Sequence, residues 1–157
     1  MKQGAGEIVG RVRSTIIPLH GLELLVPNAV IAEVVEYKAP QAIEGNLPRW
    51  LLGAMAWRGL TLPLVSLEFL LGKKQIPSTT RGRIVVLYGL GPARKQLPYF
   101  GMVSRDLPRL VHVGNVNIEP DEGGISSPLL ATNVVIDGSR ASIPDFDKMT
   151  ASIGSAL

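Results

Sequence analysis

The chain has 157 residues, of which 46% are hydrophobic and 18% charged, so it can build a sizeable core and wholesale disorder is excluded. It contains no cysteine, which excludes disulfides and thiolate chemistry. The net charge is +3, but the cations are scattered and only 5% of residues are aromatic. A nucleic-acid platform needs a dense basic stripe with stacking rings, so this balance argues against one.

Turn residues punctuate the whole chain. The 17 glycines and 12 prolines separate many short Val/Ile/Leu runs, which favours a mainly β protein. We predict a first strand over Thr15–Leu19, a turn at His20-Gly21 and a returning strand over Leu22–Val26. The length fits one domain, or two small subdomains that share one core.

A short helix is predicted after Pro27, with Asn28 as its N-cap. Glu33 falls on its exposed side, and the opposite face carries Val30, Ile31, Val34 and Val35. A weak strand over 37–43 and a loop over 44–48 follow.

The most informative stretch is an Arg58-Gly59 pair between two apolar runs. Met55 and Trp57 alternate with small residues before it, and the far side alternates through Leu60, Leu62 and Leu64. This period of two predicts a hairpin of two half-buried strands, with Arg58 presented at its tip. A lone cation on a rigid apolar hairpin suits docking better than catalysis. The plainer alternative is a solvated turn residue.

The remaining elements follow from caps and turn pairs. Ser66 is predicted to cap a helix over 67–71, Asp145 a last helix to about Ile153, and Asp137-Gly138 is a strong hairpin-turn pair. Strands are predicted over 84–88, 99–103, 129–136 and 140–143.

We expect a single domain over 14–153, flanked by tails at 1–13 and 154–157, with two interleaved subdomains meeting near the polar segment 72–82. Residues 1–14 have no apolar core typical of a signal peptide. The apolar stretch 51–71 carries Arg58, Pro63 and Glu68, and therefore resembles strands more than a membrane helix. A cytoplasmic protein is expected.

The sequence lacks the complete motifs that are typical of catalytic and cofactor-binding sites. No His and carboxylate cluster has metal-ligand spacing, and His20 and His112 both have structural explanations. The Gly89-x-Gly91 pair lacks the third glycine of a dinucleotide site, and Gly72-Lys73-Lys74 lacks the rest of a P-loop. We expect no enzyme activity, no cofactor and no small-molecule substrate.

Two spaced motifs resemble the CheW-like adaptor family of bacterial chemosensory systems, over about residues 14–153. The first is Pro27-Asn28-Ala29-Val30-Ile31-Ala32-Glu33-Val34, and the second is Pro48, Gly53, Arg58-Gly59, Pro63 and Leu67. The segments 24–34 and 57–68 are most similar to ChpC-type adaptors of type IV pilus (twitching) systems. The second half departs from the family pattern, because Arg105 precedes the acid at Asp106.

The resemblance implies two five-stranded SH3-like β-barrels, braced by short helices around a shared core. It also implies a non-catalytic adaptor between the cytoplasmic tip of a methyl-accepting chemoreceptor and the regulatory domain of a CheA-like histidine kinase. Such a protein reaches the membrane only through the receptor. The expected partner-binding residues are Ala32, Glu33, Val34, Trp57, Arg58, Gly59 and Leu60.

Plainer alternatives remain at these positions: Trp57 as core and Glu33 as a solvated helix face. Two other functions also remain open. One is a small β-barrel nucleic-acid binder that uses Lys73/Lys74 and Arg81/Arg83, and the other is an enzyme with a cryptic site.

Overall fold

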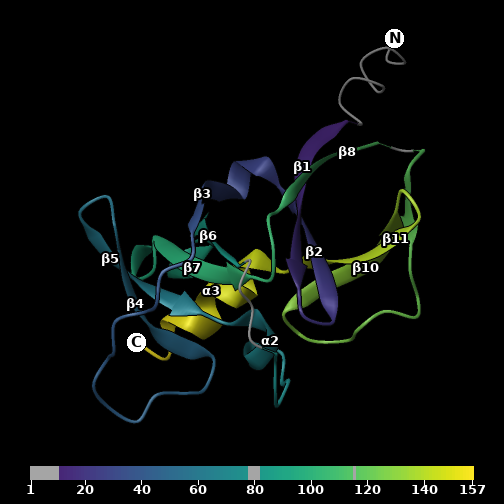
Figure 1. Cartoon of the computed structure of the whole chain (residues 1–157). Coiled ribbons are helices and arrows are strands. Elements are labelled where there is room, and N and C mark those ends of the chain that lie inside the picture. The colour runs from purple at the N-terminus through teal and green to yellow at the C-terminus, as the bar shows by residue number, and fades with distance from the viewer. Residues whose placement is uncertain (1–10, 78–81, 115) are drawn as a thin grey trace.

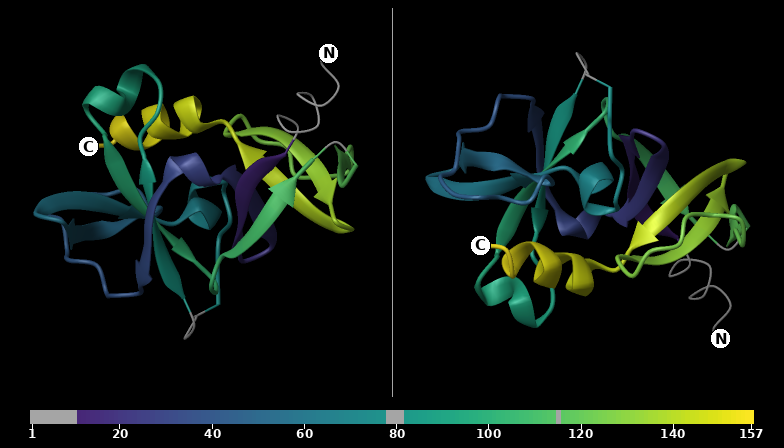
Figure 2. Two further views of the ribbon diagram at one scale, coloured as in Figure 1. Left: turned by 90° about the horizontal axis from the view of Figure 1, so that it is seen from above. Right: turned by 90° about the horizontal axis from the view of Figure 1, so that it is seen from below.

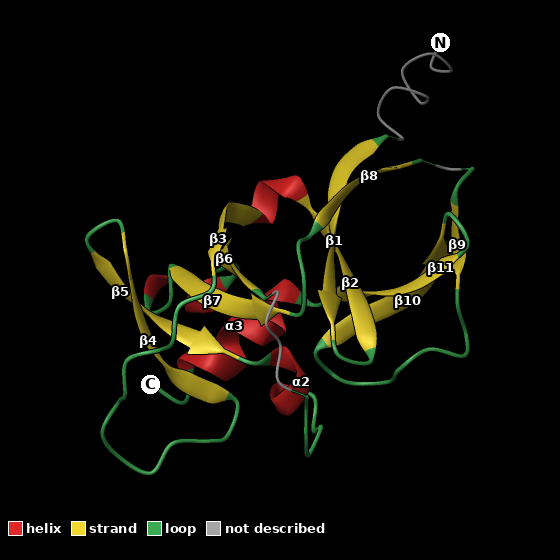
Figure 3. Ribbon diagram, in the orientation of Figure 1, coloured by secondary structure: helices red, strands yellow, loops and turns green. Residues whose placement is uncertain are grey.

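A computed structural model describes residues 11–77, 82–114 and 116–157. Strands dominate it and gather into two groups, one on each side of the molecule (Figures 1 and 3). Two of the helices, η1 and η2, are single 3-10 turns. The elements in chain order are β1 (Val12–Leu19), β2 (Leu22–Pro27), η1 (Asn28–Val30), β3 (Ile31–Glu36), β4 (Leu51–Trp57), β5 (Leu60–Val65), α2 (Leu67–Leu70), β6 (Arg83–Tyr88), η2 (Pro92–Lys95), β7 (Tyr99–Ser104), β8 (Arg109–Val113), β9 (Ile118–Pro120), β10 (Leu130–Ile136), β11 (Ser139–Pro144) and α3 (Phe146–Gly154).

The two sheets are interleaved along the chain. One has six strands in the order β8-β1-β2-β11-β10-β9, and the other has five in the order β3-β6-β7-β5-β4. The chain leaves the six-stranded sheet through η1 and returns to it between β7 and β8. Residues 72–77, within the predicted junction, therefore connect β5 and α2 to β6, so the chain stays in the five-stranded sheet on both sides of them. Residues 78–81 lie outside the described residues.

Each sheet curls on itself. In the six-stranded sheet, β8 and β9 are the two outer strands, yet β8 ends at Val113 and β9 begins at Ile118. So short a connection requires the sheet edges to come close, and Figure 1 shows the sheet bending round on the right. The mainly β, two-sheet architecture is confirmed; one sheet has the five strands expected, and the other gains a sixth because β9 pairs with β10.

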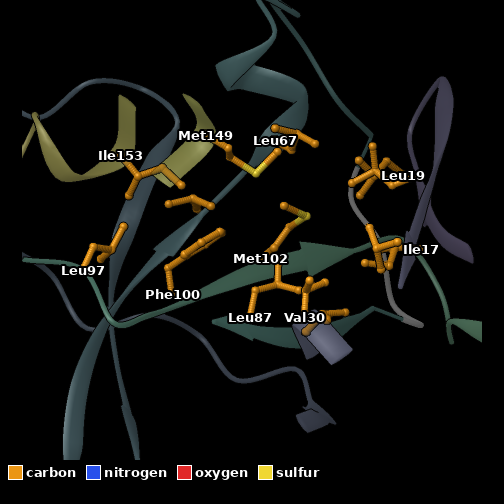
Figure 4. Close-up of a cluster of buried hydrophobic side chains, with 14 of the residues drawn as sticks. Ile17, Leu19, Val30, Leu67, Leu87, Leu97, Phe100, Met102, Met149 and Ile153 are labelled. Carbon is orange, nitrogen blue, oxygen red and sulfur yellow. The ribbon is translucent and has the colours of Figure 1, made fainter. Parts of the chain in front are cut away.

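One apolar core joins the two sheets. Ile17 and Leu19 of β1 share it with Phe100 and Met102 of β7, and all four are buried. Figure 4 shows Ile17 and Leu19 at one side of this core and Ile153 of α3 at the other. Seen from above and below in Figure 2, α3 runs from the six-stranded sheet toward the five-stranded one. Burial of a common apolar surface therefore fixes the two barrels against each other.

The predicted caps at Ser66 and Asp145 and the predicted Asp137-Gly138 turn are confirmed. The side chain of Ser66 accepts a hydrogen bond from the backbone of Phe69, and that of Asp145 accepts one from Lys148. Ile136 and Ser139 pair across the Asp137-Gly138 turn. Among the described residues, no helix is long and apolar enough to cross a membrane.

The helix predicted after Asn28 is wrong. Only the 3-10 turn η1 forms, without a side-chain cap, and the Asn28 amide oxygen instead accepts a hydrogen bond from the Thr15 hydroxyl. Residues from Ile31 onward form β3, which pairs with β6. Three of its residues are β-branched and therefore fit a pleated surface against β6 better than a helix.

The weak strand predicted over 37–43 is also wrong, since that stretch makes only one isolated bridge, Gln41 to Ala54. The strands β8 and β9 and the turn η2 were not predicted from the sequence. Both strands are short and mostly unburied, so their sequences carry little periodicity.

Gly89 closes the connection between β6 and β7. Its amide donates to the carbonyl of Pro98, and a Cβ at this position would collide with the carbonyl oxygen of Leu97. We expect Gly89→Ala to destabilise the fold by about 2–3 kcal/mol, because backbone must move to make room.

Gly154 provides the matched control, because it ends α3 and an added Cβ there would make only ordinary contact with Leu97. Gly154→Ala is expected to stabilise by about 0.5–1 kcal/mol through reduced chain entropy. Urea unfolding measures both, and equal midpoints for the two variants would contradict the close approach at Gly89.

Candidate partner-binding site

The hairpin tip at Arg58-Gly59 is a two-residue turn with an unusual sequence. Trp57 and Leu60 pair directly across it, with φ of 47° at Arg58 and 77° at Gly59. Positive φ at both central residues defines the type I′ turn that suits hairpin twist. Arginine lacks the conformational freedom of glycine there, and the left-handed conformation costs it about 1–2 kcal/mol.

The same chain builds this turn a second time with an ordinary sequence. At Asp137-Gly138 the φ values are 48° and 81°, so the two turns have nearly the same backbone. Aspartate tolerates that conformation because its short polar side chain bonds locally. Arginine at the first turn is thus an exception within one molecule, and backbone preference does not explain it.

The structure brings three of the predicted residues together, and we call Glu33, Trp57 and Arg58 the clasp. The indole Nε1 of Trp57 donates a hydrogen bond to Oε1 of Glu33 at 2.9 Å. The same carboxylate oxygen lies 3.2 Å from Nη2 of Arg58. The guanidinium also lies over the Trp57 ring, 4.9 Å from its centroid, in a cation–π contact.

The clasp joins two strands that do not pair. Glu33 stands on β3 and Trp57 on β4, and these strands are the opposite edges of the five-stranded sheet. Their side chains therefore hold the sheet edges together where backbone hydrogen bonds do not. The register with β6 shifts between Ile31 and Glu33, and shifts of this kind, as at a β-bulge, commonly re-aim side chains.

Trp57 belongs both to the core of the five-stranded barrel and to the candidate partner-binding site. It is 9% exposed and packs with Leu62, Leu64 and Val86 inside the five-stranded barrel, while its indole nitrogen reaches Glu33. Glu33 lies on a strand and not on the predicted helix; its side chain is 40% exposed. The Arg58 side chain is 66% exposed, so the cation is held in place yet remains open to a partner.

The other four predicted residues are chain neighbours of the clasp and take no part in its hydrogen bond, ion pair or cation–π contact. Ala32 is half-buried and packs against the same barrel core as Trp57. Val34 and Leu60 are exposed apolar side chains, and Gly59 has open space beside it. They lie next to Glu33 on β3 and next to Arg58 in the hairpin, where they add two exposed apolar side chains close in sequence to the clasp.

Comparison with protein families matches residues 13–154 to the CheW-like domain. The chain belongs to the CheW-like domain family. In three dimensions it is similar to the scaffolding protein TtCheW from Thermoanaerobacter tengcongensis, with a TM-score of 0.69 and 17% sequence identity. That similarity covers 85% of this chain and 84% of the other, and at this identity it shows the shared fold. A search of curated proteins finds no match.

Sequence reasoning missed two residues beside the clasp of this CheW-like domain. Tyr99 lies against Trp57 with ring centroids 5.0 Å apart, and Tyr88 lies 5.3 Å beyond Tyr99. Tyr88 and Tyr99 are direct partners across β6 and β7. The available signal was the rarity of aromatic residues, because two of the three tyrosines fall at the facing ends of two predicted strands.

Two cations of the nucleic-acid alternative, Lys73 and Arg83, are hydrogen-bonded to backbone carbonyls. Lys73 Nζ donates to the carbonyl of His20, and Arg83 donates to the carbonyl of Gly82. Arg81 lies outside the described residues. Within the described ranges, no group of three His, Asp or Glu is placed to hold a metal ion.

Proposed function

We propose that this CheW-like chain is a non-catalytic adaptor that couples the cytoplasmic tip of a chemoreceptor to the regulatory domain of a CheA-like histidine kinase. Family membership supports the adaptor class. The partner-binding surface of the proposal is the clasp with Ala32, Val34, Gly59 and Leu60 around it. In this proposal the chain works in the cytoplasm and reaches the membrane only through the receptor.

The observation that carries the proposal is the arginine in the left-handed turn. Arg58 occupies a backbone conformation that disfavours it, and it is fixed there by a carboxylate and an indole while two thirds of its side chain stays exposed. Strained residues that persist in a well-supported setting concentrate at functional sites. A cation held in one position also loses little entropy on binding, which favours docking.

Two barrels on one core suit a linking role. The shared core holds the barrels rigidly together, so each barrel can present its own surface in a fixed relative orientation. Partners bound to the two barrels are then held in a fixed position relative to each other. Two weak contacts reinforce each other because binding of the first raises the effective concentration for the second. Signalling through such a link depends on its geometry.

The finer assignment we propose is a type IV pilus, twitching-motility pathway, because segments 24–34 and 57–68 resemble ChpC-type adaptors. Partner choice tests this assignment. The purified chain is offered receptor fragments and kinase regulatory domains from a pilus system and from a flagellar system of one bacterium. Preferential capture of the pilus components is expected, and preference for the flagellar components would reject the subtype while leaving the adaptor class intact.

Arg58→Asn tests the surface with little disturbance of the turn. Asparagine accepts the left-handed conformation, and the exposed ion pair contributes less than about 1 kcal/mol, so folding is expected to be unchanged. Capture of receptor or kinase fragments in a pull-down is expected to fall about tenfold.

Asp137→Asn is the control, because it places asparagine at the same position of the matching turn in the other sheet. It should leave capture unchanged. Full capture by a folded Arg58→Asn variant would refute a role for this surface.

A further inference from the structure

A second surface lies beside the clasp, on the other side of Tyr99. It is an open groove of about 740 Å³ between η1 and the connection from β6 to β7. Its apolar lining comes mainly from Tyr88, Leu90, Pro98 and Tyr99, and its charged lining from Arg94 and Lys95. The clasp residues do not line it, so this groove is a separate candidate for binding.

The wall of the groove is a row of neighbouring rings that are tilted against one another. Tyr88 and Tyr99 stand side by side across two paired strands, and Trp57 packs behind Tyr99. Tyr88 is 40% exposed and Pro98 is exposed beside it. Rings supported from behind and open in front form the kind of aromatic-lined groove that receives a proline-rich extended segment, because such a segment is already ordered before it binds.

The rim of the groove is positive. Arg94 and Lys95 are exposed in the last turn of η2, and neither forms an ion pair within the described part of the chain. The acid that packs beside this connection is Asp147, and it lies against Gly91, at the opposite end of η2 from Lys95. The two cations therefore select a negatively charged occupant.

We infer that this groove binds an extended, acidic, proline-containing segment of a partner protein. Its prolines pack on Tyr88 and Tyr99, and its carboxylates pair with Arg94 and Lys95. The inference goes beyond the proposed coupling function and does not depend on it, since the groove is defined by its own lining.

Peptides of defined composition test the chemistry directly. A labelled Glu-Pro repeat peptide is titrated with the full chain and followed by fluorescence anisotropy. A Lys-Pro repeat controls for charge, and a Glu-Gly repeat controls for the preformed extended conformation. The Glu-Pro peptide is expected to bind about tenfold more tightly than either control and to weaken as salt rises.

Two double variants locate the binding. Arg94→Glu with Lys95→Glu is expected to weaken Glu-Pro binding by about tenfold or more. Arg13→Glu with Lys74→Glu makes the same change in net charge at exposed positions elsewhere and should change it by less than about twofold. Tyr88→Ala is expected to weaken binding without unfolding the chain, because its ring is partly exposed.

Several results would overturn the inference. They are equal binding of the three peptides, absence of Glu-Pro binding at millimolar concentration, or equal losses in the two double variants. Tighter binding of a helical Glu-Leu peptide would reject the extended occupant. Arg58→Asn should retain Glu-Pro binding, so a failure of the groove and a failure of the coupling surface give different outcomes.

Discussion

Capture of the receptor fragment and of the kinase regulatory domain is expected to fall by more than about tenfold when Arg58 is replaced by glutamate. Two carboxylates then face each other where Glu33 now pairs with a guanidinium at 3.2 Å. The reversal removes the exposed cation and also the cation–π contact with Trp57. A pull-down measures the loss, and a thermal melt verifies that the variant is folded.

Glu33→Gln separates the cation from the ion pair. Glutamine still offers an oxygen to the Trp57 indole, but Arg58 loses its charged partner and keeps its own charge. If the cation faces the partner, Glu33→Gln retains most of the capture and Arg58→Glu does not. Equal losses in both variants would instead assign the effect to closure of the barrel.

Arg109→Glu controls for loss of an ion pair as such. Arg109 pairs with Glu23 at 3.0 Å on the six-stranded sheet, and its side chain is 54% exposed, comparable with Arg58. Exposed pairs of this kind contribute less than about 1 kcal/mol, so folding should tolerate both reversals. Capture that falls equally with Arg109→Glu would show a general response to charge and no specific surface.

Local chemistry made the hairpins and caps predictable. The Asp137-Gly138 pair, the alternation around Arg58 and the caps at Ser66 and Asp145 each act within a few residues, and all form as expected. The segment after Asn28 failed because Val30, Ile31, Val34 and Val35 fit a helical face as well as a strand. Pairing with β6, a distant strand, decided the outcome.

The clasp shows why its residues could be predicted from the sequence although the contacts between them could not. Glu33 and Trp57 stand 24 residues apart on strands at opposite sheet edges. Periodicity indicates which face of a strand is buried, but it carries no information on how far a sheet curls. The resemblance to a family identified both residues, whereas the hydrogen bond between them required the closed barrel. The resemblance did not identify Tyr99, and its contact with the Trp57 ring likewise required the folded barrel.

Removing the Trp57 ring has the largest expected effect on stability. Trp57 is 9% exposed and fills the end of the barrel core with Leu62, Leu64 and Val86, so Trp57→Ala is expected to cost about 3–5 kcal/mol. Trp57→Phe keeps an aromatic ring and loses only the Nε1 donor to a half-exposed carboxylate. Since Glu33 can turn to water, we expect a cost of about 1–2 kcal/mol. Urea unfolding measures the stability of both Trp57 variants. Trp50→Phe is the control, because it makes the same chemical change at a tryptophan that packs on the shared core.

The location of the destabilisation caused by Trp57→Phe tests the clasp more directly than the size of the free-energy change does. If the Trp57–Glu33 hydrogen bond holds the sheet edges together, Trp57→Phe loosens β3 and β4, the two strands that lack a backbone partner on that side. Amide hydrogen exchange should then accelerate in those strands, while the six-stranded sheet keeps its protection. Trp50→Phe should not reproduce that pattern. Uniform acceleration through both sheets would mean that Trp57 acts only as core, and Arg58 would then be positioned by its turn alone.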